Sequence, residues 1–325
     1  MSDDLTIRRA DPADLPDILE LARRSLGWTD DDAQFLEWKH LQNPFGVSPM
    51  WVALDGDRIA GFRTFLRWEF VGPDGRRIVA ARAVDTATDP DYQGRGIFTR
   101  LTLEAIAELP ADRVEMIFNT PNGKSLPGYL KMGWTEVGRL AVAVMPTSGR
   151  FPVVVATARR PAGRWPLPTV LGDDPSDVFA DRIAVQALLD SQPDPAAIAT
   201  RRTPELLAWR YGYEPLGYRV LLRGPTPESG LAVFRRRQRG KAVEGVLCDV
   251  IVPEADPRLT RQLIDRVRSA AAADYLIRVD PRPLALGPFV RLPKVGPVLA
   301  CRPLDDSPAP ALAAWGLCMG DVELF

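Results

Sequence analysis

The sequence is short of the residues that build metal sites, disulfides and hydrolytic triads. It has one histidine, His40, and three cysteines, Cys248, Cys301 and Cys318, which lie far apart along the chain. These residues cannot supply a zinc ligand set or a disulfide framework, and they indicate a reducing, cytoplasmic compartment. A triad with Ser or Cys would need His40, whose place in a helical pattern favours a packed or surface helix residue instead. Hydrolase chemistry is therefore not the leading function class, and we expect no metal site.

Long apolar runs and an excess of one charge are missing as well. No stretch approaches the roughly 18 apolar residues of a membrane span. The first residues lack the basic and then apolar pattern of a signal peptide. A formal net charge of −1 gives no bulk electrostatic reason to bind nucleic acid. We therefore expect no membrane or nucleic-acid partner, and no sequence feature specifies an oligomeric state.

The chain length predicts two domains. A single core stops growing near roughly 250 to 300 residues, and this chain has 325. A stretch rich in Pro, Arg and Gly follows a strand expected over residues 137–145. We therefore expect a first domain over residues 1–147, a linker over 148–168 and a second domain over 169–325. Alternating strand and helix patterns predict an α/β fold with mixed sheets.

The second half repeats the first. The pattern of residues 35–46, around Trp38, recurs over residues 206–217 around Trp209, and each copy precedes an apolar strand. Further on, Val84-Asp85 has an echo in Cys248-Asp249. The second copy is expected to cover the first sheet or to complete a pocket at the domain junction. The densest charge run of the chain, residues 235–241, is expected to be a solvated hairpin tip.

Residues 82–101 organise the first half. Residues 83–88 are predicted to form a strand, residues 89–91 stop it, and helical spacing resumes at Ile97. Gly94 and Gly96 allow the backbone to turn, so that successive N–H groups of residues 93–98 point into one concavity at the positive end of the helix. We call residues 93–98 the anion cradle. An ordinary strand-to-helix turn is the alternative interpretation.

The flanks of this turn carry a family resemblance. Gln93-Gly94-Arg95-Gly96-Ile97-Phe98 resembles the acetyl-coenzyme A loop of the GCN5-related N-acetyltransferases (GNAT superfamily), which has Gln or Arg, two residues, Gly, one residue, and Gly or Ala. Phe98 departs from the small residue at the last position. The stretch from Asn122 through Ser125 and Tyr129 to Gly133-Trp134 resembles the second segment of the superfamily. The tandem arrangement resembles acetyltransferases of the mycobacterial enhanced-intracellular-survival type.

The resemblance implies a tandem GNAT fold with an intact first copy and a degenerate second copy. It implies that strands 83–88 and 114–119 lie parallel and splay apart, that acetyl-CoA is the co-substrate, and that no metal takes part. Asn122 would contact the arm of the cofactor and Ser125 would line it. The expected cofactor-binding residues are Val84, Thr86, Ala87, Thr88, Gln93, Gly94, Arg95, Gly96, Ile97, Phe98, Thr99, Asn122 and Ser125. By contrast, residues 253–259 have no glycine and carry two acids, so the second copy is not expected to bind coenzyme A.

Two residues are expected to carry the chemistry. The resemblance places Tyr129 beside the thioester sulfur, where it would act as general acid for the departing thiolate. Asp85, on the central strand, would draw a proton from the amine, directly or through water. Each has a structural alternative: Tyr129 as a core ring with a wet hydroxyl, and Asp85 as a strand-face acid with a backbone or Arg partner.

We therefore expect an acetyl-CoA-dependent N-acetyltransferase that acts by direct attack of a small-molecule primary amine. A non-catalytic acyl-CoA sensor or scaffold is the alternative from another class. An aminoacyl transferase that uses aminoacyl-tRNA is disfavoured by the near-neutral charge. Trp28, Trp38 and Phe45 would suit an acceptor ring but are more often core residues. The carboxylate of Phe325 invites comparison with a terminal base.

Overall fold

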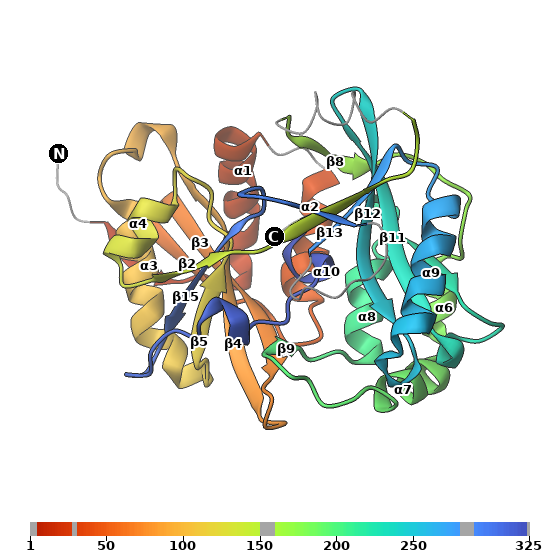
Figure 1. Cartoon of the computed structure of the whole chain (residues 1–325). Coiled ribbons are helices and arrows are strands. Elements are labelled where there is room, and N and C mark those ends of the chain that lie inside the picture. The colour runs from red at the N-terminus through yellow and green to blue at the C-terminus, as the bar shows by residue number, and fades with distance from the viewer. Residues whose placement is uncertain (1–4, 28–30, 150–159, 280–288, 324–325) are drawn as a thin grey trace. The chain divides into compact units, whose positions relative to one another are not determined.

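The computed structural model of the chain describes residues 5–27, 31–149, 160–279 and 289–323 (Figure 1). The chain forms two compact units that interleave along the sequence. The first unit comprises Met1–Phe70, Arg77–Gly138 and Val298–Pro310, and the second comprises Val71–Arg76, Arg139–Pro297 and Ala311–Phe325. Each unit contains a mixed sheet with helices packed on it, so the predicted α/β class is confirmed.

The first unit contains one sheet with strands in the order β1-β2-β3-β4-β5-β15-β6. Its strands are β1 (Thr6–Arg9), β2 (Met50–Asp55), β3 (Arg58–Val71), β4 (Arg77–Thr88), β5 (Met116–Asn119), β6 (Thr135–Arg139) and β15 (Val298–Pro303). Its helices are α1 (Leu15–Leu26), α2 (Asp31–Leu36), α3 (Ile97–Glu108) and α4 (Leu126–Lys131), with a π-helical turn η2 (Glu37–Leu41) and 3₁₀ turns η1 (Pro12–Asp14), η3 (Pro90–Tyr92) and η4 (Leu109–Asp112).

Alternation along the strands divides the first core into two layers. On β2, Trp51 and Ala53 pack in one cluster with residues of α3 and α4, whereas Met50 and Val52 pack in another cluster with residues of α1 and α2. Successive side chains of a strand point to opposite faces, so helices cover both faces of this sheet. Helices on both faces explain why nearly every residue of β3 is buried.

The helix α3 lies unusually close to the sheet at Gly61. A Cβ atom at Gly61 would lie 2.7 Å from the Ile97 side chain and 3.2 Å from the Ala87 carbonyl oxygen. Only glycine leaves room for this approach. Because Ile97 is the first residue of α3, Gly61 fixes where the helix begins and therefore where the anion cradle lies.

The central strand β4 is longer than the strand that the sequence predicts over residues 83–88. It runs unbroken from Arg77 to Thr88. It pairs in parallel with β5, as a helical crossover requires, and this expectation is confirmed.

The two sheets exchange strands. The single strand expected over residues 137–145 is wrong: the chain forms β6 in the first sheet and then β7 (Val142–Pro146), which pairs antiparallel with β13 (Tyr275–Val279) in the second. In return, β15 pairs antiparallel with β5 in the first sheet. The units therefore differ from the consecutive boundaries expected at 147 and 168, because β-pairing between distant segments leaves no local sequence signal.

The second unit has a sheet in the order β10-β11-β12-β13-β7-β14, with β8 paired to β11. The other strands of this sheet are β8 (Ala162–Pro166), β10 (Arg219–Leu222), β11 (Leu231–Arg239), β12 (Ala242–Ile251) and β14 (Val290–Leu292). The two-residue strand β9 (Ala199–Thr200) is not part of it. The helices of the second unit are α6 (Pro175–Ala180), α7 (Arg182–Asp190), α8 (Pro204–Gly212), α9 (Pro257–Ala270) and α10 (Met319–Val322), with 3₁₀ turns η5 (Glu214–Leu216), η6 (Pro227–Ser229), η7 (Pro253–Ala255) and η8 (Leu312–Ala314). As in the first unit, a helix joins two parallel strands, here β12 and β13. The repeated architecture is confirmed.

The solvated hairpin tip expected over residues 235–241 is wrong for much of this run. Arg235 is fully buried and forms an ion pair with Glu323 at 2.6 Å. Arg237 and Arg239 both pair with the buried Glu244. Distant carboxylates therefore neutralise a charge run that looks solvent-facing in sequence.

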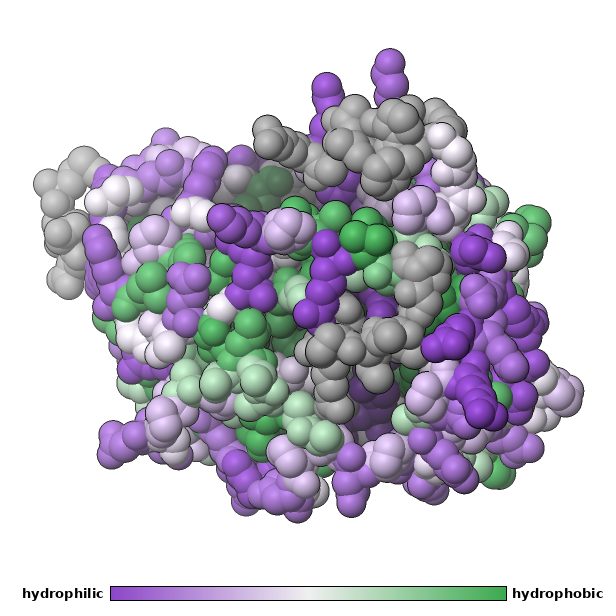
Figure 2. Space-filling view, viewed as in Figure 1, coloured by the Kyte–Doolittle hydropathy of each residue, from purple (hydrophilic) through white to green (hydrophobic). Residues whose placement is uncertain are grey.

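No helix in the described ranges is long and apolar enough to cross a membrane. Figure 2 shows hydrophilic side chains over much of one face, with apolar side chains in smaller groups between them. Scattered apolar groups of this kind are ordinary at a protein surface and need no partner to explain them.

Substitution of Gly61 tests the close approach of α3. We expect Gly61→Ala to lower the free energy of unfolding by about 1–3 kcal/mol, because the new methyl must displace the start of α3. Urea unfolding at 25 °C measures the change. Gly123→Ala is the matched control, since a Cβ at Gly123 meets nothing within 4 Å. Equal stability of the two variants would contradict the packing described.

Candidate active site

The start of α3 is uncapped. Gly94 and Gly96 have φ values of 80° and 71°, in the left-handed region that favours glycine. Gly96 precedes the first helical residue, and no side chain caps the helix there. The first helical hydrogen bond runs from the Arg100 N–H to the Gly96 carbonyl at 3.0 Å. The N–H groups of residues 97–99 therefore have no partner within the helix, as the cradle requires.

Side-chain contacts of Asp89 and Tyr92 hold the loop that precedes the cradle. The buried Asp89 carboxylate pairs with Arg58 at 2.8 Å and Arg24 at 3.3 Å. Burial alone would raise the pKa of Asp89, but the Arg58 hydrogen bond and the nearby charges outweigh it and lower that pKa. The Tyr92 hydroxyl donates to Asp55 at 2.6 Å. The turn between β2 and β3, where Asp55 and Arg58 lie, thus holds the loop while Gln93 stays exposed.

Phe98 points into the core. Its ring packs edge-on against Tyr129 at a centroid distance of 5.6 Å. The same ring lies 3.4 Å from the position of a Cβ atom at Gly128 on α4. The bulky residue that departs from the family pattern therefore fills space between α3 and α4. Exposed neighbours on the loop are Gln93, Gly94, Gly96 and Thr99, and Arg95 is half-buried over the Tyr92 ring.

The strands β4 and β5 pair over three residues and then separate. Their register runs from Ala80 opposite Met116 to Arg82 opposite Phe118. The strand β5 ends one residue later, whereas β4 continues to Thr88. The side chains of Val84 and Ala87 are buried and Thr86 donates to the Phe62 carbonyl at 2.9 Å, so these residues offer a ligand mainly their backbone. Such a strand edge can pair with an extended ligand arm.

The second segment forms a turn that leads into α4. The Asn122 side-chain oxygen accepts from the N–H groups of Lys124 at 2.9 Å and Ser125 at 3.0 Å. Asn122 is exposed, and its amide nitrogen has no partner among the described residues. The turn thus fixes the side chain while leaving a donor free for a ligand.

Tyr129 is buried, and a buried arginine holds its hydroxyl. Arg63 on β3 donates to the Tyr129 oxygen at 2.5 Å. The Tyr129 ring also lies 5.0 Å from that of Trp134. The sequence alone does not identify Arg63, because β3 also contains Arg58 and Arg67 and no local pattern tells which of these arginines is buried.

Asp85 lies in a separate polar cluster. Its carboxylate pairs with the Lys39 ammonium at 2.7 Å and with His40 Nε2 at 2.8 Å, and His40 Nδ1 lies 3.0 Å from the Ser48 hydroxyl. Asp85 also has a φ of 36°, which is strained for a residue other than glycine. In the described chain none of its contacts is with Tyr129. The structure therefore does not bring together the two residues expected to share the chemistry.

The charges in this cluster hold Asp85 ionised and His40 neutral. Burial would raise the pKa of Asp85, but the Lys39 charge and the His40 hydrogen bond hold that pKa well below its usual range. Burial lowers the pKa of His40, against the pull of Asp85. Because a carboxylate only accepts, the His40 Nε2–H donates to Asp85 and Nδ1 accepts from Ser48. Neither residue is left as a ready base.

The second unit keeps an equivalent of this contact. Asp249 is the echo of Asp85, and it accepts from the Tyr211 hydroxyl at 2.5 Å and pairs with Arg202 at 2.7 Å. Tyr211 stands in α8 at the position that corresponds to His40 in the repeat. A contact kept in both copies favours the structural interpretation of Asp85.

The second unit has no open cradle. Its corresponding helix, α9, is capped by the Asp256 carboxylate, which accepts from the N–H groups of Arg258 at 2.6 Å and Leu259 at 3.1 Å. The donors that would hold an anion are thus already used by a carboxylate of the chain. Glu254, with a φ of 55°, adds a further acid just before this end.

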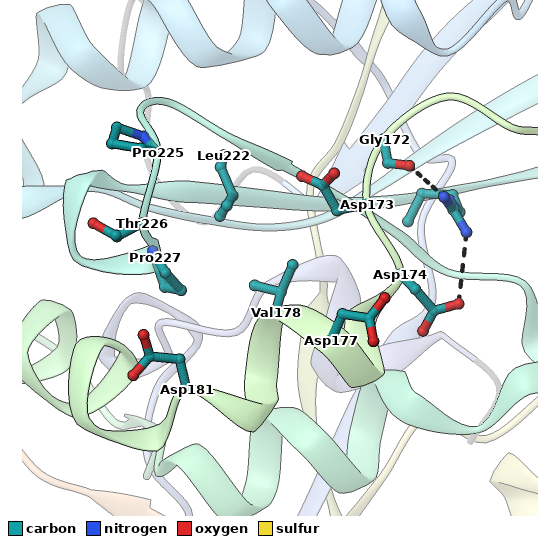
Figure 3. Close-up of a pocket in the computed structure, with 11 residues that line it drawn as sticks. Gly172, Asp173, Asp174, Asp177, Val178, Asp181, Leu222, Pro225, Thr226 and Pro227 are labelled. Carbon is teal, nitrogen blue, oxygen red and sulfur yellow. Dashed lines mark hydrogen bonds and ion pairs between the residues drawn. The ribbon is translucent and has the colours of Figure 1, made fainter.

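A pocket of about 510 Å³ in the second unit is lined by four aspartates, Asp173, Asp174, Asp177 and Asp181 (Figure 3). Two of these acids cap helices: Asp174 accepts from the Ser176 N–H at 2.9 Å and Asp181 from the Ala184 N–H at 3.0 Å. Asp174 also lies 3.6 Å from Arg219. Helix capping accounts for two of the four carboxylates without a ligand.

The expected acceptor aromatics pack mainly in the core. Trp38 is buried against Phe35 at 5.2 Å, and the half-buried Phe45 meets Trp68 edge-on at 6.1 Å. Trp28 and Phe325 lie outside the described residues. Among the residues that the structure describes, no group of three or more His, Cys, Asp or Glu side chains is placed to hold a metal ion.

Comparison with known proteins agrees with this geometry. Residues 6–137 match the family model described as an acetyltransferase (GNAT) domain. The search of curated proteins found no match.

Solved structures share the fold of the whole chain at low identity. A GCN5-related N-acetyltransferase from Anabaena variabilis has a TM-score of 0.65 at 13% identity, over 93% of this chain and 73% of its own. A probable N-acyltransferase from Enterococcus faecalis has a TM-score of 0.66 at 14% identity, over 93% and 72%. Eis1 from Mycobacterium abscessus has a TM-score of 0.58 at 14% identity, over 93% and 74%. Residues 6–137 therefore match a GNAT acetyltransferase domain, and the chain as a whole has a tandem GNAT fold.

Proposed function

We propose that the chain is an acetyl-CoA-dependent N-acetyltransferase that moves the acetyl group to a primary amine by direct attack. The uncapped start of α3 carries the proposal, because a helix N-terminus with free N–H groups is a binding site for a phosphate group. In this proposal the first unit is catalytic and the second unit is a degenerate copy with its helix start closed by Asp256.

The described residues suit the parts of coenzyme A in turn. The N–H groups of residues 93–98 would hold the pyrophosphate, where helix polarity favours negative charge. The free edge of β4 over residues 83–88 would pair with the amide groups of the pantetheine arm. Asn122 would donate to that arm through its free amide nitrogen, and Ser125 would line it.

Tyr129 is proposed as the general acid. The amine nitrogen attacks the thioester carbonyl carbon, the C–N bond forms, and the C–S bond breaks with its electron pair going to sulfur. A thiolate leaves more readily when it receives a proton. The Tyr129 hydroxyl would give that proton and regain one from the amine, which loses one on becoming an amide. A backbone N–H of residues 83–88 would hold the carbonyl oxygen during the attack.

Asp85 is proposed to shape the strand rather than to act as base. Its carboxylate is committed to Lys39 and His40, and the second unit keeps the same type of contact without a cradle. Ion pairing to the π-helical turn η2 offsets the cost of the strained φ at Asp85. Asp85 lies on β4 beyond the last pair of that strand with β5.

A non-catalytic acyl-CoA sensor or scaffold would use the same cradle. Release of free thiol from acetyl-CoA, assayed across a panel of small primary amines, separates the two functions. Amine-dependent release supports the transferase. Saturable cofactor binding with no release for any amine would favour the sensor.

A carboxylate placed in the cradle tests the cofactor site. We expect Gly96→Glu to weaken acetyl-CoA binding by roughly 10²-fold, because the new charge faces the pyrophosphate. Calorimetric titration measures the affinity. Gly75→Glu is the matched control, since Gly75 also has a positive φ of 75° and open space around its Cβ position. Equal acetyl-CoA affinity of the two variants would show that the cradle does not bind the pyrophosphate.

Removal of the Tyr129 hydroxyl tests the general acid. We expect Tyr129→Phe to lower turnover by roughly 10² while acetyl-CoA binding stays intact. Thiol release with the best amine of the panel measures turnover. Tyr275→Phe, which removes another buried hydroxyl in the second unit, should leave turnover unchanged. Unchanged turnover in Tyr129→Phe would exclude this role.

Acid titration tests the buried histidine. His40 has a lowered pKa when folded, so below its ordinary pKa of about 6.5 the unfolded chain binds a proton that the folded chain does not. The free energy of unfolding should therefore fall from pH 6.5 to 5, by up to about 1.4 kcal/mol per pH unit. His40→Gln should flatten this slope, as His40 is the single histidine of the chain. Parallel slopes in urea unfolding series would contradict the buried neutral state.

A further inference from the structure

Arg63 is a buried cation held among aromatic rings. Only 1% of its surface is exposed. Its guanidinium carbon lies 5.0 Å from the ring centroid of Phe65, 5.2 Å from that of Phe98 and 5.3 Å from that of Tyr129. It donates one hydrogen bond, to the Tyr129 hydroxyl at 2.5 Å.

No carboxylate neutralises this charge within the described ranges. The contacts of Arg63 there are the phenol and the three rings, and its buried Nε has no hydrogen-bond partner. A buried charge without a counter-charge is costly, and ring faces compensate it only in part. A methionine would fill the same space without that cost. The cation therefore requires an explanation other than packing.

The second unit shows how a buried arginine is held for structure alone. Phe62-Arg63 on β3 has a counterpart in Phe234-Arg235 on β11. Each pair follows its own copy of the repeat, around Trp38 in the first unit and around Trp209 in the second. Arg235 pairs with Glu323 at 2.6 Å and also donates to the Arg164 carbonyl at 2.9 Å. In the copy with a closed cradle the charge is neutralised within the chain. In the copy with an open cradle the described chain leaves it uncompensated.

We propose that Arg63 is a positioning residue for Tyr129. Arg63 orients the Tyr129 hydroxyl, and its positive charge assists proton transfer from that hydroxyl to the coenzyme A sulfur. This inference rests on the proposed function. Because a guanidinium only donates, its N–H occupies a lone pair of the phenol oxygen and leaves the phenol O–H to point elsewhere. The fixed positive charge then stabilises the oxygen as its proton departs.

The proton transfer balances without any other reactant. As the C–S bond breaks, its electron pair goes to sulfur and the Tyr129 proton follows, which gives the free thiol and a phenolate. Arg63 compensates the phenolate charge until the phenolate takes the surplus proton of the amine. The negative charge thus moves from sulfur to the phenol oxygen, which lies 2.5 Å from the guanidinium nitrogen.

Free coenzyme A tests this without knowledge of the acceptor amine. The probe is coenzyme A itself, titrated with base while bound to the protein, with the ultraviolet absorbance of the thiolate as readout. We expect the bound thiol to have a pKa below the usual 8.5 or so, because the Tyr129 O–H donates to the thiolate. Arg63→Met should raise that pKa by roughly one unit, and Arg63→Lys, which keeps the charge, should restore much of it.

The controls separate orientation from general loss of charge. Arg67→Met removes another arginine of β3, one that pairs with Asp112, and should leave the thiol pKa unchanged. In a Tyr129→Phe background, Arg63→Met should have no further effect, because Arg63 acts through the phenol. Arg63→Gln repeats the test if Arg63→Met does not fold.

The outcomes distinguish the two claims. Failure of the folded wild-type protein to bind coenzyme A would overturn the proposed function and this inference with it. Binding with the same thiol pKa in wild type and Arg63→Met would overturn this inference alone. An Arg63→Met shift that persists in the Tyr129→Phe background would also overturn it, because Arg63 would then act directly on sulfur.

Discussion

The helix α3 begins without a side-chain cap, and the function proposed for the first unit depends on that open end. A cap is the usual way to satisfy the first N–H groups of a helix, and α9 uses one: Asp256 accepts from the first amides of its own helix. In α3 the corresponding residue is Gly96, which has no side chain to offer and a left-handed φ that turns the backbone. The same architecture therefore presents an uncapped helix start in one unit and a capped helix start in the other.

The closed copy also clarifies which polar contacts serve the fold. Asp85 contacts His40 in the first unit, and Asp249 contacts Tyr211 in the second. These contacts join corresponding elements of the two units, although an uncapped helix start is described in the first unit alone. The buried arginines differ between the units. Arg235 is neutralised by Glu323, whereas Arg63 faces a phenol and aromatic rings and no carboxylate in the described chain. Contacts shared by the copies are explained by architecture. Contacts that differ are the ones assigned to the proposed chemistry.

The sequence predicts the parts of this protein that depend on local pattern. The spacing of Gly94 and Gly96 predicts the turn before α3. The repeat around Trp38 and Trp209 predicts a second unit of similar architecture, and the crossover helix predicts the parallel pairing of β4 and β5. Long-range pairing has no such signal, so the exchange of β7 and β15 between the sheets was missed. The ion pairs of Glu323 with Arg235 and of Glu244 with Arg237 and Arg239 were missed for the same reason. The contact of Arg63 with Tyr129 spans 66 residues and needed the fold.

Hydrogen–deuterium exchange of the full chain tests the central claim most directly. Amides of residues 93–99 and 253–259 are compared with and without saturating acetyl-CoA. Pyrophosphate bound by backbone N–H groups predicts slower exchange at residues 93–99 and no change at 253–259, where Asp256 already holds the helix end. Unchanged exchange at residues 93–99 under saturation, or slower exchange at 253–259, would contradict the account.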